Sequence, residues 1–257
     1  MSVSFENSEQ KVKKSSAVLC LLGLVCLLVL LSLLSSNWFS KQAIKSIKVS
    51  GNTVLTLGEI NSLIDEQIMN IPSKGINLAE IRNVLITQEY IADAFVWFNS
   101  RGVLGIEIKE RVPVAIVISP KGETQFVDQD GAIFEYRFYK EYTDLPIISN
   151  VYNSKTQKVD NVALFGGVEI IKGIQNSSIA VDKIVSEIKY SFTNKDYTIF
   201  LTEFGLRIRF GRAENITDKL NKIDDFWRAD ILQEAAKNNR KNFDVRWANT
   251  LIVQPTS

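Results

Sequence analysis

Two different sequence patterns meet in the stretch Ile106-Glu-Ile-Lys-Glu110-Arg-Val-Pro-Val-Ala115 (IEIKERVPVA). Its first half alternates isoleucine with charged residues, which predicts a strand that buries one face only. Its second half opens a segment of short apolar runs separated by turn residues, which is typical of a β-rich domain. The stretch therefore predicts a boundary between one domain at residues 41–111 and a second at 112–257.

Upstream of this boundary, the pattern predicts the order strand, helix, helix, strand, strand. A short strand ends at the Gly51-Asn52 turn, and Thr56 with Glu59 has the spacing of a helix capping box. Two apolar stretches at helical spacing follow, and residues 91–98 and 103–108 flank a turn in the manner of a hairpin. Two amphipathic helices would then cover one face of a small sheet.

Downstream, the pattern predicts strands with two intervening helices. The Asp128-Gln-Asp130-Gly131 segment predicts a tight hairpin turn; calcium binding would need a longer acidic series that ends in glutamate. The remaining elements that we expect are a strand at 114–118, a helix at 159–174 weakened by Gly166-Gly167, an antiparallel meander at 184–190, 197–201 and 206–210, one helical stripe from Ile216 to Ala235, and a long last strand at 243–253.

The N-terminal segment predicts a cytoplasmic tail at 1–14 and a transmembrane helix at 15–40. No residue from Ser15 to Ser40 is charged, and an apolar run of this length reaches across a bilayer core of about 30 Å. A cleaved signal peptide is the alternative, but its apolar core is shorter and ends at a small-residue cleavage site. Lysines flank the run on both sides, so the large C-terminal body, rather than charge, favours an N-terminus inside the cell.

Composition excludes several functional classes. The formal net charge of +1 gives no broad positive field for nucleic acid. The chain has no histidine, which removes histidine-based nucleophile pairs and histidine-ligated metal sites. Its two cysteines, Cys20 and Cys26, lie inside the apolar run. We therefore expect no enzyme activity, no cofactor, no metal site and no small-molecule substrate.

With its elements in this order, the chain resembles the bacterial cell-division family FtsQ, also called DivIB. The resemblance rests on a colinear series of strings rather than on any single one. The strings are IKVSGN at 47–52, ADAFV at 92–96, IEIKERVPVA at 106–115, FVDQDGAIF at 126–134, Leu145-Pro146, Phe210-Gly211, Lys219-Leu220 and FDVRW at 243–247. The resemblance implies an α+β fold with a single N-terminal transmembrane helix, a POTRA domain at 41–111, and a family β-domain at 112–257 that ends in an edge strand.

The resemblance also implies a function. Family members act as non-enzymatic scaffolds of the division machinery, the divisome; the β-domain binds the coiled-coil division proteins FtsB and FtsL, and the POTRA domain contacts other divisome members. It implies a single-pass protein of the inner membrane with a periplasmic body at the division septum. The sequence departs from the family pattern at Asn99-Ser-Arg-Gly102, where many members carry Trp-Pro.

The resemblance places partner-binding residues on the last strand, and we expect them to be Trp247, Ala248, Leu251 and Val253. In the first hairpin the aromatic residues Phe95, Trp97 and Phe98 form a candidate recognition patch, with Phe95 and Trp97 as the expected contacts; the alternative is that these strand aromatics are packed. An edge strand leaves backbone groups free to pair with a partner segment. Two alternatives to partner binding stay open. The first is that Phe243, Val245 and Trp247 fill the core; the second is that Asp244 and Arg246 form an ion pair that only stabilises the fold.

Two other functions compete with the scaffold. A POTRA-bearing envelope assembly or transport factor would carry repeated strand-helix-helix-strand-strand units or a barrel-length series of strands, and the sequence has one such unit. An anchored hydrolase of envelope polymers would need converging carboxylates or a Ser-Lys pair, and no such motif is visible.

Overall fold

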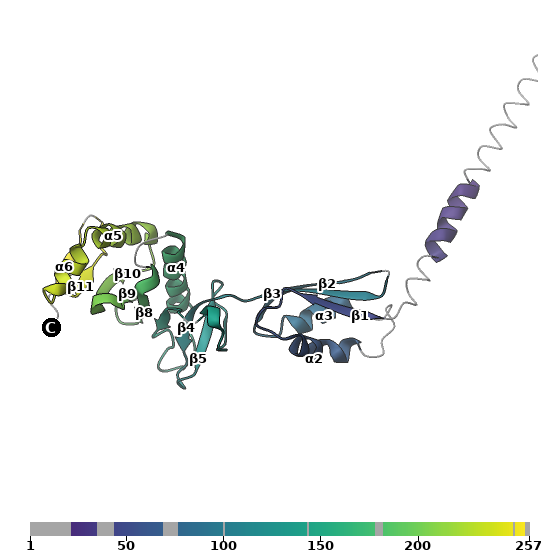
Figure 1. Ribbon diagram of the computed structural model, residues 1–257, viewed down its shortest axis with the longest axis horizontal. Helices are drawn as coiled ribbons and strands as arrows, with labels where there is room; N and C mark the ends of the chain where they lie inside the picture. Colours follow the sequence, from purple (N-terminus) through teal and green to yellow (C-terminus); the bar gives the residue numbers. More distant parts are fainter. Residues whose placement is uncertain are drawn as a thin grey trace, which may run out of the picture. The chain divides into compact units, whose positions relative to one another are not determined.

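The computed structural model describes residues 22–34, 44–68, 77–99, 101–142, 144–177, 182–248 and 250–254. Within these ranges the fold is α+β with mixed sheets (Figure 1). The chain divides into two compact units, the first ending at Glu110 and the second beginning at Arg111.

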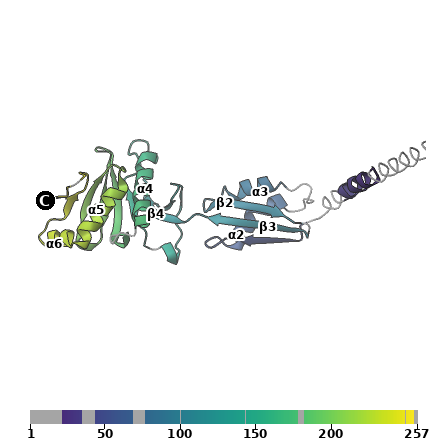
Figure 2. The same ribbon diagram turned by 90° about the horizontal axis from the view of Figure 1, so that it is seen from above.

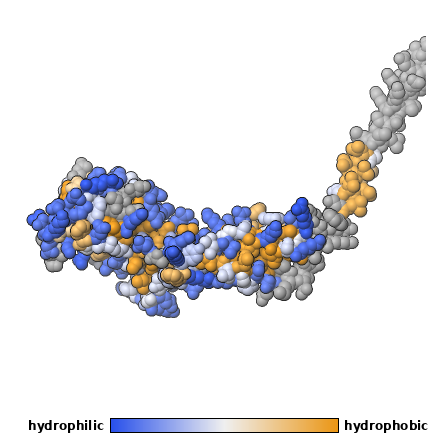
Figure 3. All heavy atoms as spheres, viewed as in Figure 1, coloured by the Kyte–Doolittle hydropathy of each residue, from blue (hydrophilic) through white to orange (hydrophobic). Residues whose placement is uncertain are grey.

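The predicted membrane-spanning helix at 15–40 is wrong for the part of the chain that the structure describes. The described helical residues there are 22–34, apolar and exposed (Figure 3). At about 1.5 Å per residue they extend roughly 20 Å, short of a hydrocarbon core of about 30 Å. No helix among the described residues is long and apolar enough to cross a membrane. The predicted tail at 1–14 and the ends of the predicted span, 15–21 and 35–40, lie outside the described residues.

The first unit has the predicted order strand, helix, helix, strand, strand. Its elements are β1 (Ser46–Ser50), α2 (Leu57–Ile68), α3 (Leu78–Leu85), β2 (Ile91–Phe98) and β3 (Val103–Glu110). The three strands form one sheet in the order β1-β3-β2, in which β1 runs parallel and β2 antiparallel to β3 (Figure 2). β2 is therefore an edge strand.

Both helices pack on one face of this sheet. The predicted capping box starts α2, since the Glu59 amide donates to Thr56 Oγ1 at 3.2 Å and the Thr56 amide donates to Glu59 Oε2 at 2.8 Å. The core between helices and sheet consists of buried residues at helical spacing and at alternate strand positions. They are Ile60, Ile64, Ile81, Leu85, Leu104, Ile106 and Ile108. Neither α2 nor α3 lies on the opposite face of the sheet (Figure 1).

Glu110 ties the loop before α2 to the end of β3. Its carboxylate accepts hydrogen bonds from the amides of Thr53, Val54 and Leu55 at 2.9, 2.8 and 2.8 Å. Gly51 makes the approach possible: its φ is +82°, and a Cβ there would lie 2.0 Å from the Ile108 carbonyl oxygen. One carboxylate thus satisfies three backbone donors of this loop.

The second unit is built on a nine-stranded sheet in the order β12-β11-β10-β9-β8-β7-β4-β5-β6. The predicted meander at β8, β9 and β10 is confirmed as antiparallel, whereas β4–β7, β7–β8 and β10–β11 pair in parallel. The strands are β4 (Pro113–Ile118), β5 (Thr124–Asp128), β6 (Ile133–Glu135), β7 (Ile147–Ser149), β8 (Val185–Ser191), β9 (Asp196–Leu201), β10 (Arg207–Gly211), β11 (Asn242–Asp244) and β12 (Ile252–Gln254).

The predicted Asp-Gly hairpin turn connects β5 to β6. Asp128 Oδ1 accepts hydrogen bonds from the amides of Asp130 and Ala132, both at 2.9 Å, and Gly131 has a φ of +77°. The other oxygen of this buried carboxylate pairs with Arg111 Nη1 at 2.7 Å. Asp128 therefore stabilises the β5–β6 turn and also binds Arg111, the first residue of the second unit.

Helix α4 (Asn161–Ser177) lies against the sheet through its glycines. A Cβ at Gly166 would lie 2.1 Å from the Tyr197 hydroxyl oxygen, and one at Gly167 would lie 2.7 Å from Ile148 Cγ2. The Tyr197 hydroxyl reaches the carbonyls of Val162 and Ala163 at 2.9 and 3.0 Å. The two glycines thus allow a close helix–sheet contact, and the helix persists through them.

The predicted single helical stripe from Ile216 to Ala235 is two helices, α5 (Ile216–Arg228) and α6 (Ile231–Lys237). The prediction of one helix is wrong because Asp230 adopts a left-handed conformation with φ of +57°, which redirects the chain. Short 3-10 helices lie at η2 (Lys140–Tyr142), η3 (Asp182–Ile184) and η4 (Glu203–Gly205).

We predict that Glu110→Gln weakens the loop before α2. The neutral amide keeps one acceptor oxygen but loses the charge that strengthens three hydrogen bonds, a loss of about 2 kcal/mol. Hydrogen exchange at the amides of residues 53–55 measures it. Glu107→Gln, on the exposed side of the same strand, is the control and should change stability by less than about 0.5 kcal/mol. Equal protection in both variants would contradict the role of Glu110.

We also predict opposite effects for two helical glycines. Gly166→Ala forces Tyr197 away from α4 and should lower the free energy of unfolding by about 1–3 kcal/mol. Gly58→Ala, in α2, meets nothing closer than Thr56 Oγ1 at 3.9 Å and should raise it by about 0.5–1 kcal/mol. Urea unfolding of the full chain measures both. A neutral Gly166→Ala would show that the contact with Tyr197 is not tight.

Candidate protein-binding site

The nine-stranded sheet ends in a hairpin of two short strands, β11 and β12. β11 is parallel to β10 and antiparallel to β12, with Phe243 opposite Val253 and Asp244 opposite Ile252. Among the described strands β12 has one neighbour, β11. One row of β12 backbone donors and acceptors therefore faces away from the sheet, as on any edge strand.

The prediction of one continuous strand at 243–253 is wrong, because the chain leaves the sheet after Asp244. The Val245 amide still donates to the Arg209 carbonyl at 3.2 Å, but the Thr250 amide donates to the Trp247 carbonyl at 3.5 Å, within a turn. Residues 245–248 and 250–251 therefore lie outside any strand, and Trp247 does not follow the strand pattern.

Four charged side chains, which we call the Asp–Arg cluster, hold the end of β11. Arg246 donates to Asp244 through Nε at 2.9 Å and Nη2 at 2.6 Å, and Arg209 Nε contacts Asp196 Oδ2 at 3.2 Å. Both carboxylates are buried. Burial alone would raise the pKa of Asp244, but the hydrogen bonds from Arg246 outweigh it and lower the pKa. Asp244 and Arg246 are thus a structural ion pair in this fold.

The loop that carries Trp247 is fixed from two sides. Lys222, on α5, donates through Nζ to the carbonyls of Val245, at 3.3 Å, and Trp247. On the other side the Arg246 side chain crosses Gly211, where a Cβ would lie 2.8 Å from Arg246 Cγ. Gly211 has a φ of +81°, so glycine suits this position in both conformation and space.

The structure separates the four residues predicted on the last strand. Trp247, 56 % exposed, and Ala248 are at the surface, whereas Leu251 and Val253 are partly buried against the hydrophobic core of the second unit. The reading of Phe243 and Val245 as core residues is correct, since both are buried, but Trp247 does not share their environment.

Ile252 is an exposed residue of this edge that the sequence pattern missed. It lies opposite Asp244 in the register and is 38 % exposed. A continuous strand would put Leu251 and Val253 on the face of Trp247, but β11 ends at Asp244 and this alternation is broken. The exposed apolar groups at the edge are therefore Trp247 and Ile252.

Phe95 and Trp97 belong to the first unit, on β2. Phe95 is 63 % exposed and stands opposite Glu107; Trp97 stands opposite Gly105. The Trp97 indole covers this glycine, since a Cβ there would lie 2.0 Å from Trp97 Cε2. Trp97 is thus packed on one ring face and partly exposed on the other, while Phe95 projects from the sheet.

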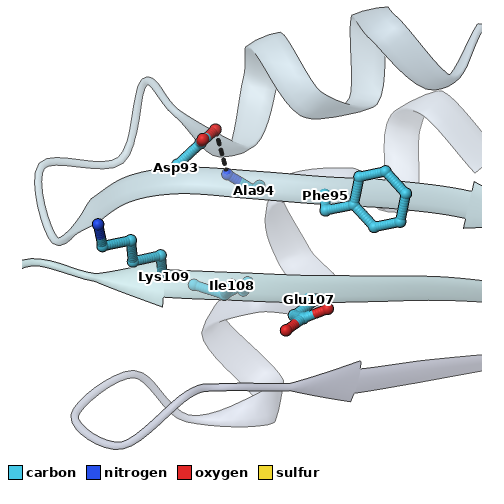
Figure 4. Close-up of a pocket in the computed structure, with 6 residues that line it drawn as sticks. All are labelled: Asp93, Ala94, Phe95, Glu107, Ile108 and Lys109. Carbon is cyan, nitrogen blue, oxygen red and sulfur yellow. Dashed lines mark hydrogen bonds between the residues drawn. The ribbon is translucent and has the colours of Figure 1, made fainter.

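Phe95 borders an open hollow of about 410 Å³ that is lined by residues of the paired strands β2 and β3 (Figure 4). Its lining residues are Asp93, Ala94, Phe95, Glu107, Ile108 and Lys109. Asp93 is bound by Arg82 at 2.7 Å, and this hydrogen bond lowers the pKa of Asp93. The carboxylate is thus held ionised, which suits an ion pair better than general acid catalysis.

No group of three or more metal-ligating side chains is placed to hold an ion anywhere in the described ranges. The acidic pair singled out in the sequence, Asp128 and Asp130, is part of the β5–β6 turn, and Asp128 is occupied by Arg111. What the described surface offers is an open strand edge with exposed apolar side chains, an arrangement suited to binding a polypeptide.

Comparison with known proteins agrees with the architecture of the second unit. Residues 112–253 match the family model described as FtsQ/DivIB, C-terminal related. No curated protein matches the chain. The match extends from β4 to β12 and includes the Asp–Arg cluster and the exposed edge. The chain therefore belongs to the FtsQ/DivIB family of non-enzymatic cell-division proteins.

Proposed function

We propose that this chain is a divisome scaffold that catalyses no reaction and captures a partner polypeptide at the β12 edge. The observation that carries the proposal is the outward backbone row of β12 beside Trp247 and Ile252. A partner strand that adds to this edge gains main-chain hydrogen bonds, and apolar side chains at alternate positions supply specificity. We propose that the protein acts at the division septum.

The partners that we propose for the edge are coiled-coil division proteins of the FtsB and FtsL type. A short strand of three residues gives few hydrogen bonds, so much of the affinity must come from side chains. Trp247 suits this role because a rigid, exposed indole loses little conformational entropy on binding and buries a large area. Lys222 and the Asp–Arg cluster keep it in place before the partner arrives.

We further propose that the first unit is a POTRA domain and that Phe95 and Trp97 contact other divisome members. Support comes from the open face of the three-stranded sheet, where Phe95 projects next to the hollow of Figure 4. The two surfaces belong to different compact units, so each can be tested by itself.

We predict that Trp247→Ala with Ile252→Lys reduces recovery of the co-produced FtsB- and FtsL-like partners by at least about tenfold. Both side chains are exposed, so the thermal midpoint should stay within about 2 °C of the parent chain. The control is Phe138→Ala, which removes an aromatic ring that is 77 % exposed elsewhere in the second unit. Equal partner recovery from the double variant and the control would rule out the edge.

We also predict that a fluorescent fusion of the full chain is enriched at midcell in dividing cells. The measurement is the ratio of midcell to lateral fluorescence through the cell cycle. The Phe138→Ala fusion serves as the control for folding and expression and should show the same ratio. A uniform signal throughout division would contradict a septal site.

A further inference from the structure

The turn between β9 and β10 holds an aromatic residue in a backbone conformation that suits asparagine or glycine. Phe204 has φ of +57° and ψ of 0°, and Gly205 follows with φ of +62°. The Leu201 amide donates to the Leu206 carbonyl at 3.0 Å and closes the hairpin. Residues 202–205 thus form a four-residue loop whose last two residues have positive φ, a conformation that glycine and asparagine adopt most readily.

Phe204 differs from the other residues that adopt this conformation. The non-glycine residues with positive φ among the described residues are Asn150, Gln157, Lys195, Phe204, Asn215, Asp230 and Asn239. Four of these are Asn or Asp, whose short side chains tolerate the left-handed region, and two have unbranched chains. Phe204 alone is aromatic, so its backbone is strained. Strain of this kind clusters at binding sites.

The strain is not explained by burial of the ring. Phe204 remains 43 % exposed, and its ring centroid lies 6.5 Å from that of Trp227. The backbone of Trp227 is held in place, because its carbonyl accepts hydrogen bonds from the Asp230 amide at 3.0 Å and from Gln233 Nε2 at 2.9 Å. Ile231, at the start of α6, is also exposed, and α6 packs against η4.

We call Phe204, Trp227 and Ile231 the Phe204 surface. A carboxylate stands directly before two of its residues in the chain: Glu203 precedes Phe204, and Asp230 precedes Ile231. The nearby ion pairs join Arg228 to Asp224 and Lys237 to Glu234, and neither Glu203 nor Asp230 takes part in one within the described residues. Lys237 also interacts with Asp230. The carboxylates Glu203, Asp224, Asp230 and Glu234 outnumber the cations Arg228 and Lys237, so the border of the apolar surface is acidic in net charge.

We propose that the Phe204 surface is a second docking site, which receives an apolar side chain of a partner polypeptide flanked by lysine or arginine. The apolar group stacks on the aromatic pair, and the basic groups pair with Glu203 and Asp230. A membrane surface fits less well, because anionic lipid headgroups are repelled by these carboxylates.

The strand pairing shows that the Phe204 surface and the Trp247 end of the β12 edge are separate places on the sheet. η4 precedes Arg207, which pairs with Asn242 at the start of β11. Arg246 and Trp247 follow the other end of β11, where Arg246 crosses Gly211. The two surfaces therefore lie at opposite ends of β10, and loss of one leaves the other in place.

The test uses the purified full chain and a fluorescent synthetic peptide with two leucines between paired arginines and lysines. Phe204→Asn places the preferred residue in the turn, so it should raise the thermal midpoint by about 2–4 °C while weakening peptide binding by about tenfold. Lys195→Asn is the matched control: Lys195 has φ of +53° in the β8–β9 turn, so the midpoint should rise and binding should not change.

A second pair of substitutions tests the acidic border. Glu203→Gln with Asp230→Asn removes both charges, and asparagine keeps the left-handed conformation at 230. Fluorescence anisotropy at low salt should then show about tenfold weaker binding, and a charge-reversed peptide should not bind the parent chain.

Three results would overturn the proposal. A lower thermal midpoint for Phe204→Asn would show that the Phe204 ring stabilises the fold, which is a structural role. Unchanged peptide affinity in that variant, or equal binding of the charge-reversed peptide, would remove the binding role. A dimer in sedimentation velocity that Phe204→Asn abolishes would assign the surface to a second copy of this chain instead.

Discussion

The exposed edge of the second unit depends on two buried carboxylates that must each find a cation. An uncompensated charge in a protein interior is strongly destabilising, so Asp196 and Asp244 require Arg209 and Arg246. Asp196 lies on β9, Arg209 on β10 and Asp244 on β11, and Arg246 follows β11 by two residues. The two ion pairs therefore hold these three strands together at one end of the sheet. Because Arg246 turns back to Asp244, the chain leaves the sheet there.

This constraint has a direct consequence for binding. The turn after Asp244 takes Trp247 out of the core pattern, and Lys222 fixes the carbonyls on either side of Arg246. The chain then returns as β12, which pairs with β11 alone among the described strands. An ion-pair cluster inside the sheet thus determines which apolar side chains are exposed, and a surface ordered in advance loses less entropy when a partner docks.

The sequence patterns succeeded where structure is set locally. The capping box at Thr56, the turn at Asp128–Gly131 and the alternation of β8 to β10 follow from neighbouring residues. The predictions failed where contacts between residues far apart in the sequence determine the structure. The Gly166-Gly167 pair was read as a weakness because the partner that needs the space, Tyr197, lies in another strand. The apolar pattern at 243–253 predicts one continuous strand because it does not detect the Asp244–Arg246 ion pair or the contacts from Lys222 on α5, and Ile252 is missed as a result.

The remaining discrepancies come from single residues with positive φ, which periodicity does not detect. Asp230 divides an apolar stripe of unbroken helical spacing into α5 and α6, and Phe204 occupies a turn position whose backbone conformation glycine and asparagine adopt most readily. In both cases the backbone conformation places an apolar group, Ile231 or Phe204, at the surface instead of in the core. Asparagine or glycine would fill the Phe204 position without strain, so the ring adds a cost to the turn and still leaves a large apolar group exposed, as Ile231 is. A strained and exposed apolar group is better explained by binding than by folding.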